Sequence, residues 1–132
     1  MDDFEYLDEC AARWQDLPAK KLTRQQQAVV DVVNTIGLIE GDGVEALWSE
    51  CDGYTDRIIE SFRMAGGSEI ADRLQGTSFC KYIIARTPPG ADDWAYSSPE
   101  EEKKLRDVLF FVSEKGPGAR EGLLKFLPQR RS

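Results

Sequence analysis

The apolar residues of this chain recur at steps of three and four along almost its whole length, which is the periodicity of an α-helix. One face of the first such segment carries Phe4, Leu7, Ala11 and Trp14. Proline at position 18 follows the expected end of this helix. No alternating segments joined by a hairpin turn are present. The pattern predicts an all-α fold of six to seven short helices, forming one domain over residues 1–132.

The second apolar segment is the one place where a β-strand is a rival. Residues 28–33 are rich in β-branched side chains, which favour strands. However, Thr23 followed by Gln26 has the spacing of a capping box, in which two side chains satisfy the first backbone N–H groups of a helix. The cap and the helical spacing together favour a helix.

Glycine, proline and serine residues mark the later boundaries. A helix over residues 44–51 should end at Asp52-Gly53, and the next should run from about Tyr54 to a left-handed turn at Gly66-Gly67. We expect Ser68 to cap the helix that follows, and Gly76 to interrupt it.

The segment 87–98 is the one long loop, because its Pro-Pro-Gly sequence forbids regular structure. Ser98 should cap the next helix, with Pro99 at its first position and Glu101 at its third. This helix is expected to end at Gly116-Pro117. A last short helix would carry Leu123, Leu124 and Leu127.

The formal charge of −7 is concentrated in the first half of the chain. Residues 1–60 contain 14 acidic and 5 basic side chains, a net charge of −9, whereas residues 61–132 have a net charge of +2. An acidic surface repels nucleic acid, because Lys and Arg supply most of the affinity for phosphate. It attracts a basic partner. The alternative is a solvated acidic face that only keeps the protein soluble.

The chain contains no histidine, which removes the commonest general base and metal ligand. Cys10, Cys51 and Cys80 are scattered, as expected of reduced, at least half-buried thiols in a cytoplasmic protein. The sequence has neither a secretory signal pattern nor an apolar run of membrane-spanning length. These features disfavour an enzyme and indicate a cytoplasmic protein that does not bind membranes.

The acidic stretch 37–62 could hold calcium, but its spacing does not fit an EF-hand loop. Such a loop requires glutamate at position 12, and this position is Gly53 when counted from Asp42 and Arg63 when counted from Asp52. We therefore expect no metal and no cofactor.

The same stretch contains two carboxylate pairs that a catalytic mechanism could use, Glu40 with Asp42 and Asp52 with Asp56. Such chemistry needs one member whose pKa is shifted by burial or by its neighbour. Acidic residues at helix starts are more often caps, so the pattern favours a structural role.

Residues 28–76 resemble the domain of unknown function 4375. The resemblance is carried by an apolar helix, the glycine corner "EGDGV", the aromatic helix "EALWSEC", a "DG" turn and the segment "YTDRIIESFRMAGGSEIADRLQ". Gly41, Asp42, Gly43 and Val44 fall on the corner, where Asp42 and Gly43 replace the usual Gly-Gly. Trp48 falls on the aromatic segment. The closing turn matches Gly66-Gly67, Ala71 and Leu74.

The resemblance implies an all-helical fold, small bacterial proteins and no established enzymatic activity. It also implies DNA mimicry, in which carboxylates take the place of phosphates on the surface offered to a DNA-binding protein, often by a dimer. No individual site residue is implied. Independently, Asp52, Asp56 and Glu60 are spaced so that they would share one helix face, as would Asp2, Glu5 and Glu9.

The candidate partner-binding residues are Asp42, Glu45, Asp52, Asp56, Glu60, Trp94 and Tyr96. The two aromatic residues could form a binding hot spot or fold back as a lid over the core. Arg130 and Arg131, in the basic tail 129–132, could bind an acidic surface or form a solubilising end.

The sequence thus predicts a non-enzymatic module that binds another protein through an acidic surface, with DNA mimicry as its most specific form. The partner would be basic or DNA-binding, nucleic acid would not bind directly, and a homodimer is compatible with the pattern. The alternative is an immunity or antitoxin-like protein that neutralises a toxin. An enzyme using a carboxylate pair is a weaker third reading.

Overall fold

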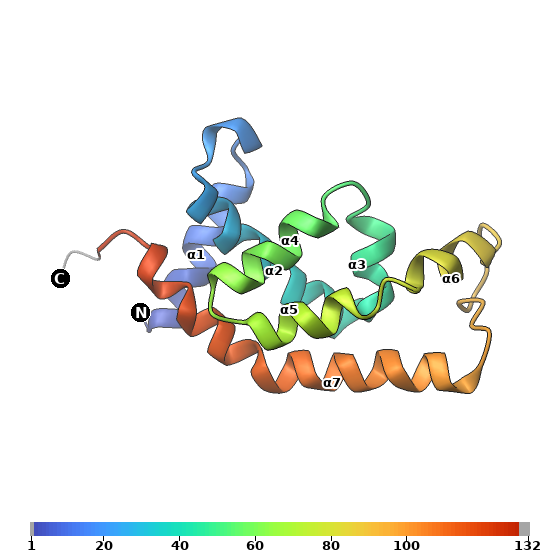
Figure 1. The fold of residues 1–132 in the computed structure, drawn as a ribbon. Helices are drawn as coiled ribbons and strands as arrows, with labels where there is room; N and C mark the ends of the chain where they lie inside the picture. Colours follow the sequence, from blue (N-terminus) through green and yellow to red (C-terminus); the bar gives the residue numbers. More distant parts are fainter. Residues whose placement is uncertain (1, 130–132) are drawn as a thin grey trace.

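A computed structural model describes residues 2–129, which form seven α-helices and two short 3-10 helices (Figure 1). In chain order these are α1 (Asp3–Gln15), η1 (Ala19–Lys21), α2 (Arg24–Asp42), α3 (Val44–Glu50), α4 (Thr55–Met64), α5 (Ser68–Gln75), α6 (Cys80–Arg86), α7 (Pro99–Gly122) and η2 (Leu124–Phe126). The described part contains no strand, so the all-α prediction is confirmed.

Helix α2 occupies the centre of the fold and packs against α1, α3, α4 and α7. Its central residues are buried on several sides, among them Val29, Val32 and Ile39, which have no exposed surface. Burial of these side chains outweighs the small helix penalty of β-branched residues. This explains why residues 28–33 form a helix despite their strand-like composition.

Side-chain caps start three of the helices. Thr23 and Gln26 form the predicted capping box, with the Gln26 backbone N–H 3.1 Å from Thr23 Oγ1 and the Thr23 N–H 2.9 Å from Gln26 Oε1. Ser98 accepts a 3.3 Å hydrogen bond from the Glu101 N–H, also as predicted. Asp2 caps α1 in the same way, through the Glu5 N–H at 2.8 Å.

The turn between α4 and α5 lies where it was predicted, but the predicted cap of α5 is wrong. Gly66 adopts the expected left-handed conformation, with φ of 80°. However, Gly67 is the N-cap of α5, and Ser68 is the first helical residue without a capping hydrogen bond. The two glycines complete the turn, so the N-cap position falls on Gly67 and Ser68 is already inside the helix.

The predicted end of α7 at Gly116-Pro117 is wrong, because the helix continues to Gly122. A proline inside a helix removes one backbone hydrogen bond. Packing compensates for this loss: Ala119 is buried, and a β-carbon at Gly116 would lie only 3.5 Å from Ile36 of α2. The ribbon of α7 bends along its C-terminal third (Figure 1). The helix predicted to follow is only the single 3-10 turn η2.

Both described ends of the chain lie on the same side of the molecule, next to α1 and the end of α7 (Figure 1). Tyr6 of α1 donates a 2.8 Å hydrogen bond to the Pro128 carbonyl, which ties the two ends together. Of the predicted basic tail, only Gln129 is described; Arg130 and Arg131 lie outside the described residues.

Candidate functional site

The structure separates the predicted partner-binding residues into two groups. The first group is Asp52, Asp56 and Glu60, which are all exposed on α4 and on the turn before it. Glu60 lies 3.8 Å from the guanidinium of Arg63, whereas Asp52 and Asp56 have no ion pair within residues 2–129. The prediction that all three share one helix face is wrong for Asp52, because Gly53, with φ of 94°, separates it from α4; only Asp56 and Glu60 lie on the helix.

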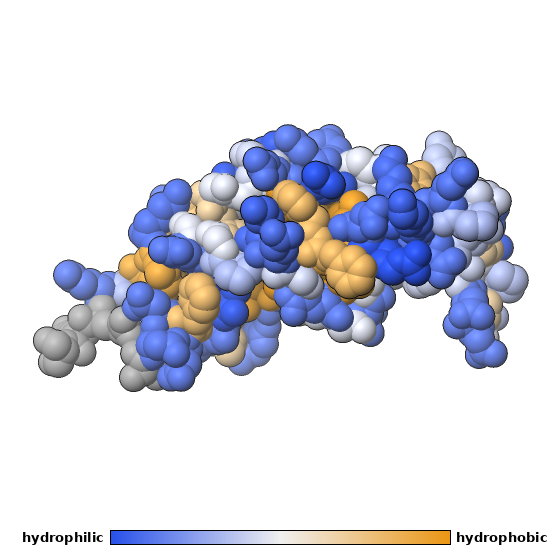
Figure 2. All heavy atoms as spheres, turned by 90° about the horizontal axis from the view of Figure 1, so that it is seen from below, coloured by the Kyte–Doolittle hydropathy of each residue, from blue (hydrophilic) through white to orange (hydrophobic). Residues whose placement is uncertain are grey.

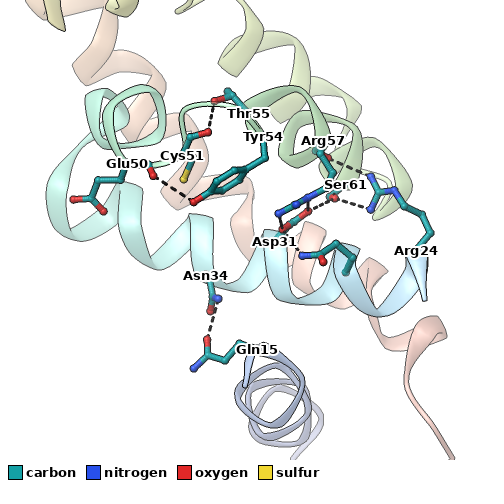
Figure 3. A network of polar contacts seen from close by, with 11 residues as sticks. Gln15, Arg24, Asp31, Asn34, Glu50, Cys51, Tyr54, Thr55, Arg57 and Ser61 are labelled. Carbon is teal, nitrogen blue, oxygen red and sulfur yellow. Dashed lines mark hydrogen bonds and ion pairs between the residues drawn. The ribbon is translucent and has the colours of Figure 1, made fainter. Parts of the chain in front are cut away.

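A polar network beside this face, centred on Asp31, was not predicted from the sequence (Figure 3). Asp31 lies in α2 and is only 5% exposed. Arg57 of α4 donates two hydrogen bonds to its carboxylate, Nε to Oδ2 at 3.0 Å and Nη2 to Oδ1 at 2.8 Å. Two parallel bonds of this kind are stronger and more directional than a single contact. The pair holds α2 and α4 together.

Three further side chains complete the network. Ser61 lies 2.8 Å from Asp31 Oδ2, and Gln27 donates to Asp31 Oδ1 at 2.9 Å. Arg24 bonds to the hydroxyl of Ser61 at 3.1 Å and to the backbone carbonyl of residue 57 at 3.2 Å. The hydrogen bond to Asp31 raises the pKa of Arg57 above its ordinary value. The buried carboxylate is therefore fully partnered.

A hollow of about 200 Å³ lies beside this network, lined in part by Cys51, Tyr54 and Arg57. The Arg57 guanidinium lies 5.0 Å from the centre of the Tyr54 ring, a cation–π distance. Burial raises the pKa of the Cys51 thiol, which keeps it protonated and unreactive. All three cysteines are buried and free of disulfides, as expected.

The second group of predicted residues, Asp42, Glu45, Trp94 and Tyr96, lines a single hollow of about 270 Å³. Gly43, with φ of 90°, turns the chain from α2 into α3 and places Glu45 in the first turn of α3. The opposite wall of the hollow is α7. Its contributing side chains are Glu102, Leu105, Arg106 and Leu109.

Glu45 is the most unusual side chain in this hollow, because it is an acidic residue that is only 8% exposed. The Tyr96 hydroxyl donates a hydrogen bond to Glu45 Oε2. Within the described residues, Oε1 has no hydrogen-bond partner and the carboxylate has no ion pair. Burial first, and then the bond to Glu45, raise the pKa of Tyr96 above its ordinary value, so the hydroxyl stays protonated.

The segment that carries Trp94 and Tyr96 is held by hydrogen bonds at Ala95 and at residue 97. Thr87 Oγ1 accepts a 2.9 Å hydrogen bond from the backbone N–H of Ala95, whose carbonyl accepts from Arg86 Nη2 at 3.0 Å. Glu101 accepts a 2.6 Å bond from the backbone N–H of Ser97, and the side chain of Ser97 first, then this backbone bond, lower the Glu101 pKa. Both aromatic rings are half-buried and pack against the core, so the loop forms a lid.

The candidate carboxylate pairs are not arranged as a catalytic or metal site in the described residues. Glu40 lies at a different hollow from Asp42, beside Asp8 and Arg120, so this pair does not converge. Asp52 and Asp56 are exposed. Among residues 2–129, no three His, Cys, Asp or Glu side chains are grouped so that they could hold a metal ion.

Two strongly exposed aromatic residues were also not predicted from the sequence. Phe110 of α7 is 62% exposed and Tyr82 of α6 is 70% exposed. On the face viewed from below, hydrophobic residues reach the surface at separate places among hydrophilic ones (Figure 2). The one sequence signal for Tyr82 and Phe110 is their position in the helical repeat, since each falls between the apolar residues that face the core. Between residues 2 and 129, no helix is long and apolar enough to cross a membrane.

Comparisons with models of protein families, with curated proteins and with solved structures gave no match. The resemblance to the domain of unknown function 4375 therefore stays a prediction.

Proposed function

We propose that this protein is a non-enzymatic module that binds a basic protein partner through the acidic face around α4. The face consists of Glu50, Asp52, Asp56 and Glu60. All four side chains are exposed, so their charge is available to a partner.

One observation carries this proposal. Arg57 is the only basic residue between Gly37 and Phe62, and its guanidinium is bound to the buried Asp31. Its charge compensates a carboxylate inside the protein. The other cation of α4, Arg63, pairs with Asp72 and Glu60. Glu50, Asp52 and Asp56 are therefore the members of the face without an ion pair within residues 2–129. Uncompensated charge of one sign attracts an oppositely charged partner over distances up to the screening length.

DNA mimicry is the most specific form of this proposal. Asp56 and Glu60 lie one helical turn apart on α4, on the scale of phosphate spacing along DNA, and Asp52 lies in the turn just before this helix. The captured partner would then be a DNA-binding protein. An immunity or antitoxin-like protein is the second candidate, because neutralising a basic toxin uses the same charge complementarity.

The decisive experiment is reversal of Asp52, Asp56 and Glu60 to lysine, followed by pull-down from the native host. The control reverses Asp107, Glu114 and Glu121, three exposed acidic residues of α7, and so changes the charge by the same amount. We expect only the first variant to lose the partner, and binding by the wild type to weaken as salt rises. Displacement of the partner by duplex DNA would distinguish mimicry from toxin neutralisation. Equal binding by both variants would refute the proposal.

A further inference from the structure

The two buried acidic residues of this protein differ in how they are partnered. Asp31 accepts hydrogen bonds from a guanidinium, an amide and a hydroxyl. Glu45 accepts one hydrogen bond, from the Tyr96 hydroxyl, and forms no ion pair within the described residues. Burying a charged group is costly unless it is paired, and a carboxylate has room for about four hydrogen bonds. Glu45 therefore has one oxygen without a partner among the described residues.

The Oε1 atom of Glu45, which has no partner among the described residues, is accessible to solvent. In residues 2–129 no buried side-chain oxygen or nitrogen lacks a hydrogen-bond partner. Glu45 Oε1, which has no such partner, must therefore keep some contact with solvent. Glu45 lines the 270 Å³ hollow, and so does Gly43, at which a β-carbon would lie 2.9 Å from Oε1, so a ligand in this hollow would lie next to the residue pair that holds this oxygen.

The rest of the hollow suits a long side chain with a positive end. Leu105 and Leu109 offer apolar surface to an aliphatic stem, and Trp94 and Tyr96 are aromatic. Guanidinium groups stack on aromatic faces and bind carboxylates through two parallel hydrogen bonds. The lining carries three carboxylates and one guanidinium, that of Arg106, so its net charge is negative.

We infer that this hollow receives an arginine side chain of the protein partner, whose guanidinium binds Glu45 Oε1. The inference deepens the proposed function, and rests on it for the identity of the partner as a basic protein. It adds a specific anchor to the diffuse attraction of the α4 face. Buried arginine anchors of this kind contribute a large share of binding energy in protein interfaces.

The test uses Nα-acetyl-arginine amide as the probe and follows the indole N–H of Trp94 by NMR, assigned with Trp94→Phe. The neutral control is Nα-acetyl-citrulline amide, which has nearly the same shape without the charge. We expect saturable shifts with arginine only. Glu45→Gln retains an acceptor for Tyr96 and should weaken binding about tenfold. Glu40→Gln, at a different hollow, should change nothing.

A variant at Arg106 distinguishes binding of a cationic side chain from binding of an anionic ligand. Arg106→Gln removes a like charge and should strengthen arginine binding, whereas it would abolish binding of an anionic ligand. Should Glu45→Gln fail to fold by circular dichroism, Asp42→Asn supplies the loss of charge at an exposed position of the same lining. Equal shifts with citrulline, tighter binding of the free diamine putrescine, or loss of binding in Arg106→Gln would each overturn the inference.

The outcomes are separable from those of the proposed function. If reversal of Asp52, Asp56 and Glu60 leaves partner capture unchanged while Glu45→Gln loses the arginine probe, the acidic face is refuted and the hollow stands. If the probe does not bind while the reversal abolishes capture, the hollow is refuted and the acidic face stands.

Discussion

Arg57 and Asp31 form a two-pronged ion pair between α4 and α2, with nitrogen–oxygen distances of 2.8 and 3.0 Å. The carboxylate is buried, whereas 37% of the arginine side chain is exposed. The pair therefore stabilises the packing of two central helices and also withdraws a positive charge from the acidic face.

Replacing Arg57 by alanine should lower the free energy of unfolding by about 2 to 3 kcal/mol, because it leaves a buried carboxylate without its cation. A fully buried pair would cost more, but Arg57 is partly solvated. Urea denaturation measures the change. Arg13→Ala is the control, since its 3.5 Å pair with Glu9 is exposed and should contribute less than about 0.5 kcal/mol. Equal losses in the two variants would contradict the assignment.

Tyr96 should make the protein less stable in alkaline solution. Its pKa is higher in the folded protein than the ordinary value of 10.0, so the folded state keeps a proton that the unfolded chain releases. The stabilisation is complete below about pH 10 and is lost as the pH rises through the folded value. Thermal melts at increasing pH should show a steeper loss for the wild type than for Tyr96→Phe. Parallel curves would show that the hydroxyl contributes nothing.

Two glycines of α7 should respond oppositely to alanine. At Gly122 a β-carbon would lie 1.8 Å from the Ala65 carbonyl oxygen, so the ends of α4 and α7 would have to move apart. We expect a loss of about 3 kcal/mol. Gly118 has open space around it, and its replacement should stabilise the helix by about 0.5 to 1 kcal/mol. The measurement is the urea midpoint. A tolerated alanine at position 122 would contradict the close approach of the two helices.

Calcium, magnesium and zinc should leave the melting temperature unchanged. An ion that binds only the folded state raises this temperature, and the rise grows with the logarithm of the ion concentration above its Kd. The acidic stretch does not have EF-hand spacing, and its carboxylates are not grouped as ligands within residues 2–129. Differential scanning fluorimetry with each ion tests this, and a rise that increases with the concentration of one ion would support a metal site.

Much of the fold could be predicted from the sequence, because it depends on local chemistry. Apolar spacing determines which residues of a helix face the core, and the capping side chains of Thr23 and Ser98 act within three residues. The lid formed by Trp94 and Tyr96 was one of two open readings. The loop sequence alone does not distinguish a lid from a binding hot spot. The position of Tyr96 depends on its hydrogen bond to Glu45, which lies 51 residues away in the sequence.

Tertiary contacts decided what the local pattern could not. Pro117 is a helix breaker in isolation, yet α7 continues because Gly116 and Ala119 pack against other helices. Asp31 has the sequence pattern of an ordinary polar residue on α2. Its burial and its bond to Arg57 exist only once α4 is placed, because the energy of a buried charge depends on the partner that the fold brings to it. For the same reason, only the three-dimensional structure separates the exposed carboxylates of α4 from Glu45.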